Sequence, residues 1–273
     1  MLVSEVERAI CPTCGGRGWV VEADGGAGTA RPCFCRQHDA VPRLLAAAGI
    51  PERYRGCRLA NFNVGSGSKR VGAQLLAARH ASIRYADGFL DEKGSCRSGL
   101  LFMGPPGVGK THLAVGVLVE LVERYLVRGR FVELNAFFNQ LQSTFGPTSP
   151  ESTQAILNPL MDAQLLVLDE LGTQQPTPWI RDVLYLIINT RYTRQLPTLF
   201  TTNYRLEAEA AGAPVANLDR GRDPVQTFDS AAALGDRLPA MLVSRLYEMA
   251  QPVVLTAVGD YRREQKAPKM HRR

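Results

Sequence analysis

Apolar residues occur in two different patterns along this chain, as short continuous runs and at helical spacing. Short, nearly uninterrupted apolar runs at 99–103, 130–134, 165–168, 198–202 and 252–256 have the length and character of buried strands. Stretches at 111–127, 135–145, 177–195 and 236–249 carry apolar residues at helical spacing. This alternation predicts an α/β fold, in which one parallel sheet of five strands has helices on both faces and ligands bind at the carboxyl ends of the strands.

Two further segments modify this picture. Residues 135–163 are long enough for two helices broken at Gly146-Pro147, and the phenylalanines at 137, 138 and 145 have the spacing of a core face. We therefore favour packing over base stacking there and assign no DNA-contact residues. The Ala-, Gly- and Pro-rich residues 207–235 are expected to form a long excursion between two core elements.

Composition places the chain among soluble globular proteins. It has 273 residues, of which 45% are apolar and 21% charged, and this length suits one or two domains. No apolar run approaches the ~20 residues that a membrane span needs, and the amino terminus lacks the pattern of a secretory signal. We expect a cytoplasmic protein with no membrane partner.

The net charge of +6 is concentrated at the carboxyl terminus. The last thirteen residues hold six Lys or Arg and one Glu, so the remainder is nearly neutral. Such a tail suits either contact with nucleic-acid phosphates or simple solvation, and charge alone does not decide between them.

Four of the six cysteines form two close pairs near the amino terminus. In a reducing compartment such pairs bind metal more often than they form disulfides. Glycines after the first pair let backbone amides turn toward the sulfurs. We predict a Zn²⁺ site, with metal binding supplying most of the module's folding free energy. The expected ligands are Cys11, Cys14, Cys33 and Cys35, and His38 is an alternative fourth ligand.

Residues 104–111 read GPPGVGKT, the phosphate-binding string G-x-x-x-x-G-K-[ST], between an apolar strand and a helix. Its glycines let N–H groups turn toward phosphate oxygens, Lys110 reaches the β and γ phosphates, and Thr111 offers its hydroxyl to Mg²⁺. Adenine contacts are expected near Asn61-Phe62. The predicted ATP-binding residues are Gly104, Pro105, Pro106, Gly107, Val108, Gly109, Lys110, Thr111, His112 and Asp169.

A second acidic element completes such a site. The apolar run 165–168 ends in Asp169 and Glu170, so Asp169 is predicted to hold Mg²⁺ with Thr111, while Glu170 polarises the attacking water. Asn203 follows the run 198–202 and is a candidate to orient that water or touch the γ phosphate, although turn chemistry alone also explains an asparagine there.

About three-quarters of the chain, residues 50–263, resembles the bacterial helicase loaders of the DnaC and DnaI type and the IstB transposition helpers, within the AAA+ ATPases. The resemblance rests on IPERYRGCRLANF, GPPGVGKTHLA, LLVLDELG, RDVLYLIINTRYTRQLPTLFTTNY and LVSRLYEMAQPVVLTAVGDYR. It implies the sheet order 5-1-4-3-2 and no carboxyl-terminal helical lid. It also implies that Asn203 is the sensor-1 residue, that Arg245 reaches a neighbouring subunit's nucleotide, and that Arg262 is the sensor-2 arginine.

The implied organisation is a zinc module with linker at 1–50, an AAA+ core at 51–263 and a basic tail at 264–273. The implied function is an ATPase that binds a replicative hexameric DNA helicase through the zinc module and assists its deposition on single-stranded DNA. Self-association would place nucleotides between subunits.

Three alternatives remain. An IstB-like helper would act on DNA and a transposase, although such proteins usually begin with a helical piece rather than cysteine pairs. A nucleotide-gated adaptor would bind ATP without hydrolysis, against which Glu170 and Asn203 argue. A small-molecule kinase would share Lys110 and Asp169, but Glu170 and the trans arginine favour water as the acceptor.

Overall fold

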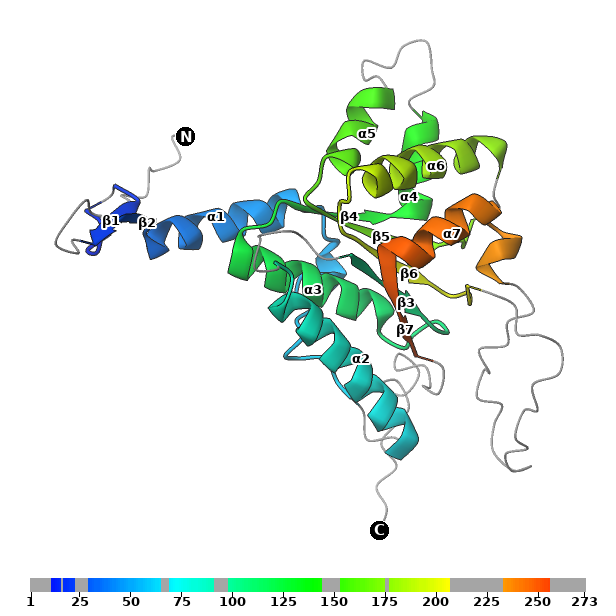
Figure 1. The fold of residues 1–273 in the computed structure, drawn as a ribbon, viewed down its shortest axis with the longest axis horizontal. Coiled ribbons are helices and arrows are strands. Elements are labelled where there is room, and N and C mark those ends of the chain that lie inside the picture. Colours follow the sequence, from blue (N-terminus) through cyan, green and yellow to red (C-terminus); the bar gives the residue numbers. More distant parts are fainter. Residues whose placement is uncertain are drawn as a thin grey trace, which may run out of the picture.

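A five-stranded parallel sheet lies between two layers of helices in the computed structural model of this protein (Figure 1). The strands are β3 (Gly99–Met103), β4 (Gly129–Glu133), β5 (Leu165–Leu171), β6 (Thr198–Thr202) and β7 (Ala250–Val254). The structure describes residues 11–15, 17–22, 29–64, 69–90, 98–143, 153–174, 177–206 and 233–255.

The strand order across this sheet is β4-β5-β6-β3-β7. Every neighbouring pair is parallel. Numbered among themselves and read from β7, the strands run 5-1-4-3-2, as the family resemblance implied. The loops after β3 and β6 therefore emerge side by side, with the end of β5 next to them.

Alternate residues of each strand face opposite helical layers. Leu100 and Phe102 of β3 pack with one group of helices, whereas Leu101 and Met103 pack with the other. Both faces of the sheet are thus buried, which explains why these strands read as continuous apolar runs. The first layer holds α1 (Phe34–Ala47), α2 (Lys69–Asp87) and α3 (Lys110–Tyr125); the second holds α4 (Leu134–Ser143), α5 (Thr153–Met161), α6 (Pro178–Thr193) and α7 (Ala240–Met249).

The predicted α/β class and the predicted helices at α3, α4, α6 and α7 are confirmed, with ends that differ by a few residues. Residues 135–163 do contain two helices, α4 and α5, although the predicted break at 146–147 lies outside the described residues. Phe137 and Phe138 are buried against the second layer, in agreement with a packing role. The sequence analysis predicts neither α1 nor α2.

An amino-terminal arm precedes this core. A hairpin of β1 (Trp19–Glu22) and β2 (Thr29–Pro32) leads into α1, which reaches back to the sheet (Figure 1). The end of α1 is part of the core, because Ala48 is fully buried and its carbonyl accepts the N–H of Phe131 at 2.7 Å. Two short 3-10 turns, η1 (Glu52–Tyr54) and η2 (Leu234–Asp236), complete the described elements. None of the helices in the described ranges is long and apolar enough to cross a membrane.

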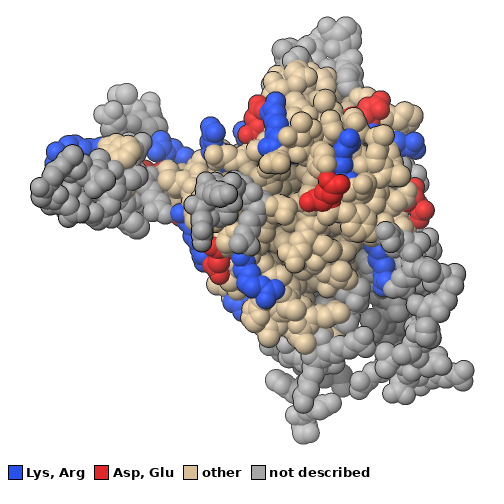
Figure 2. Space-filling model, viewed as in Figure 1, with Lys and Arg blue, Asp and Glu red and all other residues tan. Residues whose placement is uncertain are grey.

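Charge on the core is dispersed. On the face shown in Figure 2, Lys and Arg side chains of the core are interspersed with Asp and Glu, whereas the few charged side chains described on the arm are mainly basic. The described residues of the core that are visible in this view therefore form no continuous basic path for nucleic acid.

Candidate functional site

The loop between β3 and α3 is shaped by its glycines. Gly107 and Gly109 adopt φ values of 81° and 96°, in the left-handed region that favours glycine. A Cβ at Gly109 would lie 2.6 Å from Cε2 of Phe62, so no larger residue fits without displacing that ring. This tight left-handed course is typical of backbone that gathers its N–H groups around an anion.

Lys110 lies at the centre of this loop and is only 7% exposed. Its Nζ donates to the carbonyl oxygens of Gly104 and Pro105 and to Oδ1 of Asn203, at 2.8 Å each. The lysine therefore joins the loop after β3 to the end of β6, as the strand order requires. A bound phosphate would compete with these three neutral acceptors for the ammonium group.

Asp169, on β5, is fully buried beside the loop. Its Oδ1 accepts the hydroxyls of Thr111 at 2.9 Å and Thr201 at 2.6 Å, and its Oδ2 is buried with no partner in the described structure. Burial raises the pKa of Asp169. An unpartnered carboxylate oxygen beside a threonine hydroxyl is a donor set that suits Mg²⁺, so Asp169 and Thr111 fit the predicted metal role.

Glu170, unlike the fully buried Asp169, has its side chain in a cavity. The pairing of β5 with β6 is irregular between Leu168 and Leu171, and Glu170 adopts a left-handed φ of 63°. Such irregularities re-aim a side chain, and Glu170 lines a cavity instead of the core. Its N–H donates to the hydroxyl of Thr201 at 3.0 Å, and its Oε2 accepts Nδ2 of Asn135 at 3.0 Å.

Asn135 and Thr201 are site residues that the sequence analysis missed. Asn135 is a polar residue one position after the start of α4, just beyond β4. Thr201 is a buried threonine near the carboxyl end of β6. A polar residue at the carboxyl edge of a parallel sheet is the signal that identifies both positions.

Lys110, Thr111 and Glu170 line a hollow of about 260 Å³ at the carboxyl edge of the sheet. Asp169 and Asn135 do not line it, but they hydrogen-bond to Thr111 and Glu170, which do. Arg53, Tyr54 and Cys57, from the segment before β3, also line this hollow. Asn61 and Phe62 do not line it, and the expected adenine contacts near them stay a prediction. Val108 is buried in the core rather than in this hollow. The predicted residues that line it are Pro106, Gly107, Gly109, Lys110, Thr111, His112, Glu170 and Asn203, together with Thr201.

His112, next to the phosphate loop, contacts the segment before β3 at Arg58 and Asn61. Its Nε2 lies 3.0 Å from the carbonyl oxygen of Arg58 and 3.1 Å from Oδ1 of Asn61. Asn61 Oδ1 also accepts the N–H of Arg58, while its Nδ2 donates to Gly56. Because both neighbours are acceptors, Nε2 carries the hydrogen. Burial lowers the pKa of His112 and favours this neutral form.

Of the two predicted arginines, Arg245 does not line this hollow, and lies against two tyrosine rings of α6 instead. Arg262 lies outside the described residues, so its sensor-2 role stays a prediction.

The four amino-terminal cysteines lie together. Their sulfur atoms are all within 4.8 Å of one another, with Cys11–Cys33 at 3.7 Å and Cys14–Cys35 at 3.4 Å. Tetrahedral Zn²⁺ with bonds of about 2.3 Å spaces its sulfurs about 3.8 Å apart, so the cluster fits a zinc module. The side chain of His38 is not among those described.

The protonation of these thiols also fits a cation. The backbone N–H groups of Cys14 and Thr13 lower the pKa of Cys11 to about 6. The Cys14 sulfur, followed by burial, raises the pKa of Cys35 to about 12. Cys11 is thus stabilised as a thiolate, whereas a negative charge on Cys35 is disfavoured beside the other sulfurs. A bound Zn²⁺ would compensate this repulsion by adding positive charge among the four sulfurs.

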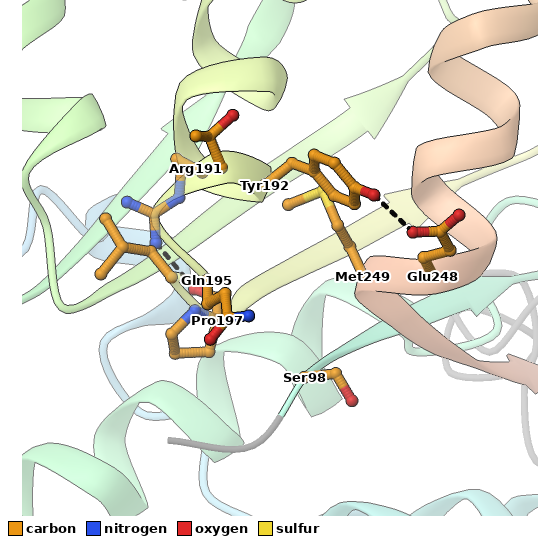
Figure 3. A pocket seen from close by; sticks show the side chains of 9 residues that line it. Ser98, Arg191, Tyr192, Gln195, Pro197, Glu248 and Met249 are labelled. Carbon is orange, nitrogen blue, oxygen red and sulfur yellow. Dashed lines mark hydrogen bonds between the residues drawn. The ribbon is translucent and has the colours of Figure 1, made fainter. Parts of the chain in front are cut away.

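A larger hollow of about 530 Å³ lies at the opposite, amino edge of the sheet (Figure 3). Its fully buried Arg191 donates to the hydroxyl of Thr198 and to three carbonyl oxygens, those of Leu160, Ala163 and Pro197, at 2.7–2.9 Å. Because carbonyls and a hydroxyl already engage this cation, we assign it the structural role of joining α6 to the loops around it.

Comparisons with known proteins agree with this geometry. Residues 92–211 match the model of the family described as IstB-like ATP binding protein. The chain is 23% identical over 200 residues to the uncharacterized protein YqaM of Bacillus subtilis (strain 168), which covers 70% of this chain and 61% of YqaM. It is 28% identical over 170 residues to the replicative helicase loader DnaC of Escherichia coli (strain K12), which covers 61% of this chain and 63% of DnaC. It thus spans about three-fifths of the length of these relatives.

The fold agrees as well. The crystal structure of the DnaC helicase loader superposes with a TM-score of 0.55 at 28% identity, over 75% of this chain and 99% of that structure. Residues 92–211, which match the family model, contain the phosphate loop, the acidic strand β5, and strand β6 with Asn203 directly after it. Residues 92–211 therefore match an IstB-like ATP-binding domain, and the chain shares the AAA+ fold of the DnaC helicase loader.

Proposed function

We propose that this protein is an ATPase that loads a replicative DNA helicase. The observation that carries the enzymatic part is the convergence of Lys110, Thr111, Glu170 and Asn203 on one hollow at the carboxyl edge of the sheet, with Asp169 hydrogen-bonded to Thr111. A site for ATP binding alone has no need of the second carboxylate, which is aimed into the hollow by its left-handed backbone.

In this proposal each residue has one task. Phosphate oxygens replace the three acceptors now held by Lys110, and Thr111 with Asp169 holds Mg²⁺, which supplies positive charge beside the phosphates. Glu170 accepts a proton from the attacking water, while Asn135 holds its Oε2. Asn203 orients the water, and Arg245 of a second subunit with Arg262 of the same subunit neutralises charge on the leaving phosphates.

The loading part is supported by the similarity to the replicative helicase loader DnaC of Escherichia coli. We infer that the zinc module on the amino-terminal arm binds a hexameric helicase in the cytoplasm, and that ATP-dependent self-association controls its deposition on single-stranded DNA. The arm is suited to docking because its hairpin and the first part of α1 extend away from the core (Figure 1). The basic tail at 264–273 is a further candidate for DNA contact.

The enzymatic part is tested by phosphate release from ATP, with Glu170→Gln as the variant and ATP binding as the control. We expect hydrolysis to fall at least about a hundredfold while ATP still binds. Unchanged turnover in Glu170→Gln would instead favour a nucleotide-gated adaptor.

The loading part is tested by light scattering after size-exclusion chromatography of the full chain with its host's replicative helicase, with and without ATP. We expect co-elution, and its loss in a Cys14→Ser/Cys33→Ser variant that still binds ATP. Absence of co-elution in every nucleotide state would reject the helicase as partner.

A transposition helper is the second candidate, because the matching family model is described as IstB-like. It predicts ATP-dependent assemblies on duplex DNA and binding to a transposase. Sedimentation of the protein with duplex and with single-stranded DNA distinguishes it from the loader.

A further inference from the structure

Arg245 of α7 is held by aromatic faces. Its guanidinium carbon lies 4.9 Å from the ring centre of Tyr185 and 5.5 Å from that of Tyr192, both on α6. Its Nη2 makes only a long contact of 3.5 Å with the hydroxyl of Tyr185, and its Nη1 is buried without a hydrogen-bond partner in the described structure. The positive charge is thus kept in place by weak contacts and has no carboxylate partner among the described ion pairs.

A carboxylate is nevertheless close in sequence. Glu248 follows Arg245 by three residues on the same helix, a spacing at which the two side chains pair readily. Instead, Oε2 of Glu248 accepts the hydroxyl of Tyr192 at 2.6 Å (Figure 3). The contact also raises the pKa of Tyr192. The tyrosine hydroxyl therefore occupies the carboxylate that would otherwise capture the arginine.

We propose that Tyr192 is a positioning residue that keeps Arg245 available to the nucleotide of a second copy of this chain. Its hydroxyl engages Glu248, and its ring, with that of Tyr185, supports the guanidinium from α6. This inference rests on the proposed function, in which Arg245 acts across a subunit boundary. Arg245 does not line the nucleotide hollow of its own chain.

The strengths of the contacts explain why this arrangement works. A guanidinium over aromatic rings at a partly exposed site is held weakly, whereas its contacts with phosphate are charge-assisted and bidentate. A phosphate from outside can therefore draw Arg245 away from the rings. A direct pair with Glu248 would compete with that phosphate on equal chemical terms.

The test uses two kinds of subunit, so that the arginine is supplied by one and hydrolysis occurs in the other. The acceptor subunit is the full chain with Arg245→Ala, and the donor subunit is the full chain with Lys110→Ala, which retains Arg245. Hydrolysis by the mixture above that of either subunit alone measures the trans arginine. Tyr192→Phe, Glu248→Gln or both are then placed in the donor only, where they do not touch the site that turns over.

We expect Tyr192→Phe in the donor to lower the mixed rate about threefold or more, because Glu248 becomes free to pair with Arg245. Adding Glu248→Gln to the same donor should restore the rate, which a purely structural loss would not allow. Tyr247→Phe removes a hydroxyl from a 46% exposed tyrosine of the same helix and should leave the rate unchanged.

An unchanged rate with Tyr192→Phe, or a loss that Glu248→Gln does not restore, would overturn the inference. The proposed trans role fails in a different way: mixing the unmodified donor and acceptor would give no stimulation although the native chain hydrolyses ATP. Melting temperatures of each donor variant show whether it has folded.

Discussion

Two substitutions of Asn203 should change ATP affinity in opposite directions: alanine should raise it and aspartate should lower it. Its Oδ1 accepts Nζ of Lys110 at 2.8 Å, the same distance as the two loop carbonyls. In the proposed mechanism the lysine leaves these acceptors for the phosphates. Asn203→Ala removes one competitor, whereas Asn203→Asp replaces a neutral competitor with a charged one.

The magnitudes follow from this geometry. A hydrogen bond to a charged group contributes about 1.5–3 kcal/mol, and because two other acceptors remain for Lys110 we take about 1 kcal/mol, or roughly fivefold tighter ATP binding by Asn203→Ala. A carboxylate at this position attracts Lys110 and repels phosphate. Unit charges 4 Å apart interact by about 4 kcal/mol near a protein surface, and half of that gives Asn203→Asp roughly thirtyfold weaker binding.

The assay is displacement of a fluorescent ATP analogue in Mg²⁺, with Glu170→Gln present in every chain so that no ATP is consumed. Single-turnover hydrolysis is measured separately with native Glu170, and both variants should be slower by about tenfold or more, because the water loses its orienting amide. Asn158→Ala is the matched control, since Asn158 is exposed and accepts a hydrogen bond from Gln154 on α5.

Tighter binding by Asn203→Ala together with weaker binding by Asn203→Asp would support the reasoning. Weaker binding by both, to a similar extent, would refute it. Asn203 would then contact the phosphates in the ground state rather than compete for the lysine.

Three other predictions concern separate parts of the molecule. Asn135→Ala removes the donor to Oε2 of Glu170 and should slow single-turnover hydrolysis by about fivefold with unchanged ATP affinity. Arg191→Met breaks four buried hydrogen bonds and should lower the free energy of unfolding by about 4 kcal/mol in urea titrations. Arg194→Met, which breaks one exposed ion pair with Asp162, should change it by less than about 0.5 kcal/mol. Metal analysis should find one Zn²⁺ per chain, lost in Cys14→Ser, with ATP affinity unchanged.

The parts of the fold that sequence reasoning predicted are those where burial is two-sided or backbone conformation is restrictive. Strands such as β3 and β6 are buried on both faces, so their apolar runs are unbroken. The phosphate loop needs glycine at the left-handed Gly109, and this requirement is visible as the second glycine of the motif.

The parts that it missed carry weak or contradictory signals. The buried face of α2 uses small residues, including Ala78 and Ser82, so its apolar periodicity is faint. Pro42 lies inside α1, where a proline normally argues against a helix. Asn135 and Thr201 join the site through contacts with β5 residues more than thirty positions away in sequence, so their only signal is a polar residue at the carboxyl edge of the sheet, which becomes specific once the strand order is known.

The topology also suggests how the nucleotide and the trans arginine are linked. Lys110 holds Asn203, and within two residues the chain reaches Arg205, which pairs with Ala233 and accepts the N–H of Leu234 at 2.6 Å. Ala233 immediately precedes the short turn η2, which is followed by α7 and Arg245. When phosphate draws the lysine away from Asn203, the end of β6 loses a contact, and the element coupled to that end is the one that carries the arginine. In our proposal, ATP binding by a subunit therefore shifts its own α7, which carries the Arg245 that contacts the nucleotide of the neighbouring subunit. A loader controlled by ATP-dependent assembly requires such a coupling.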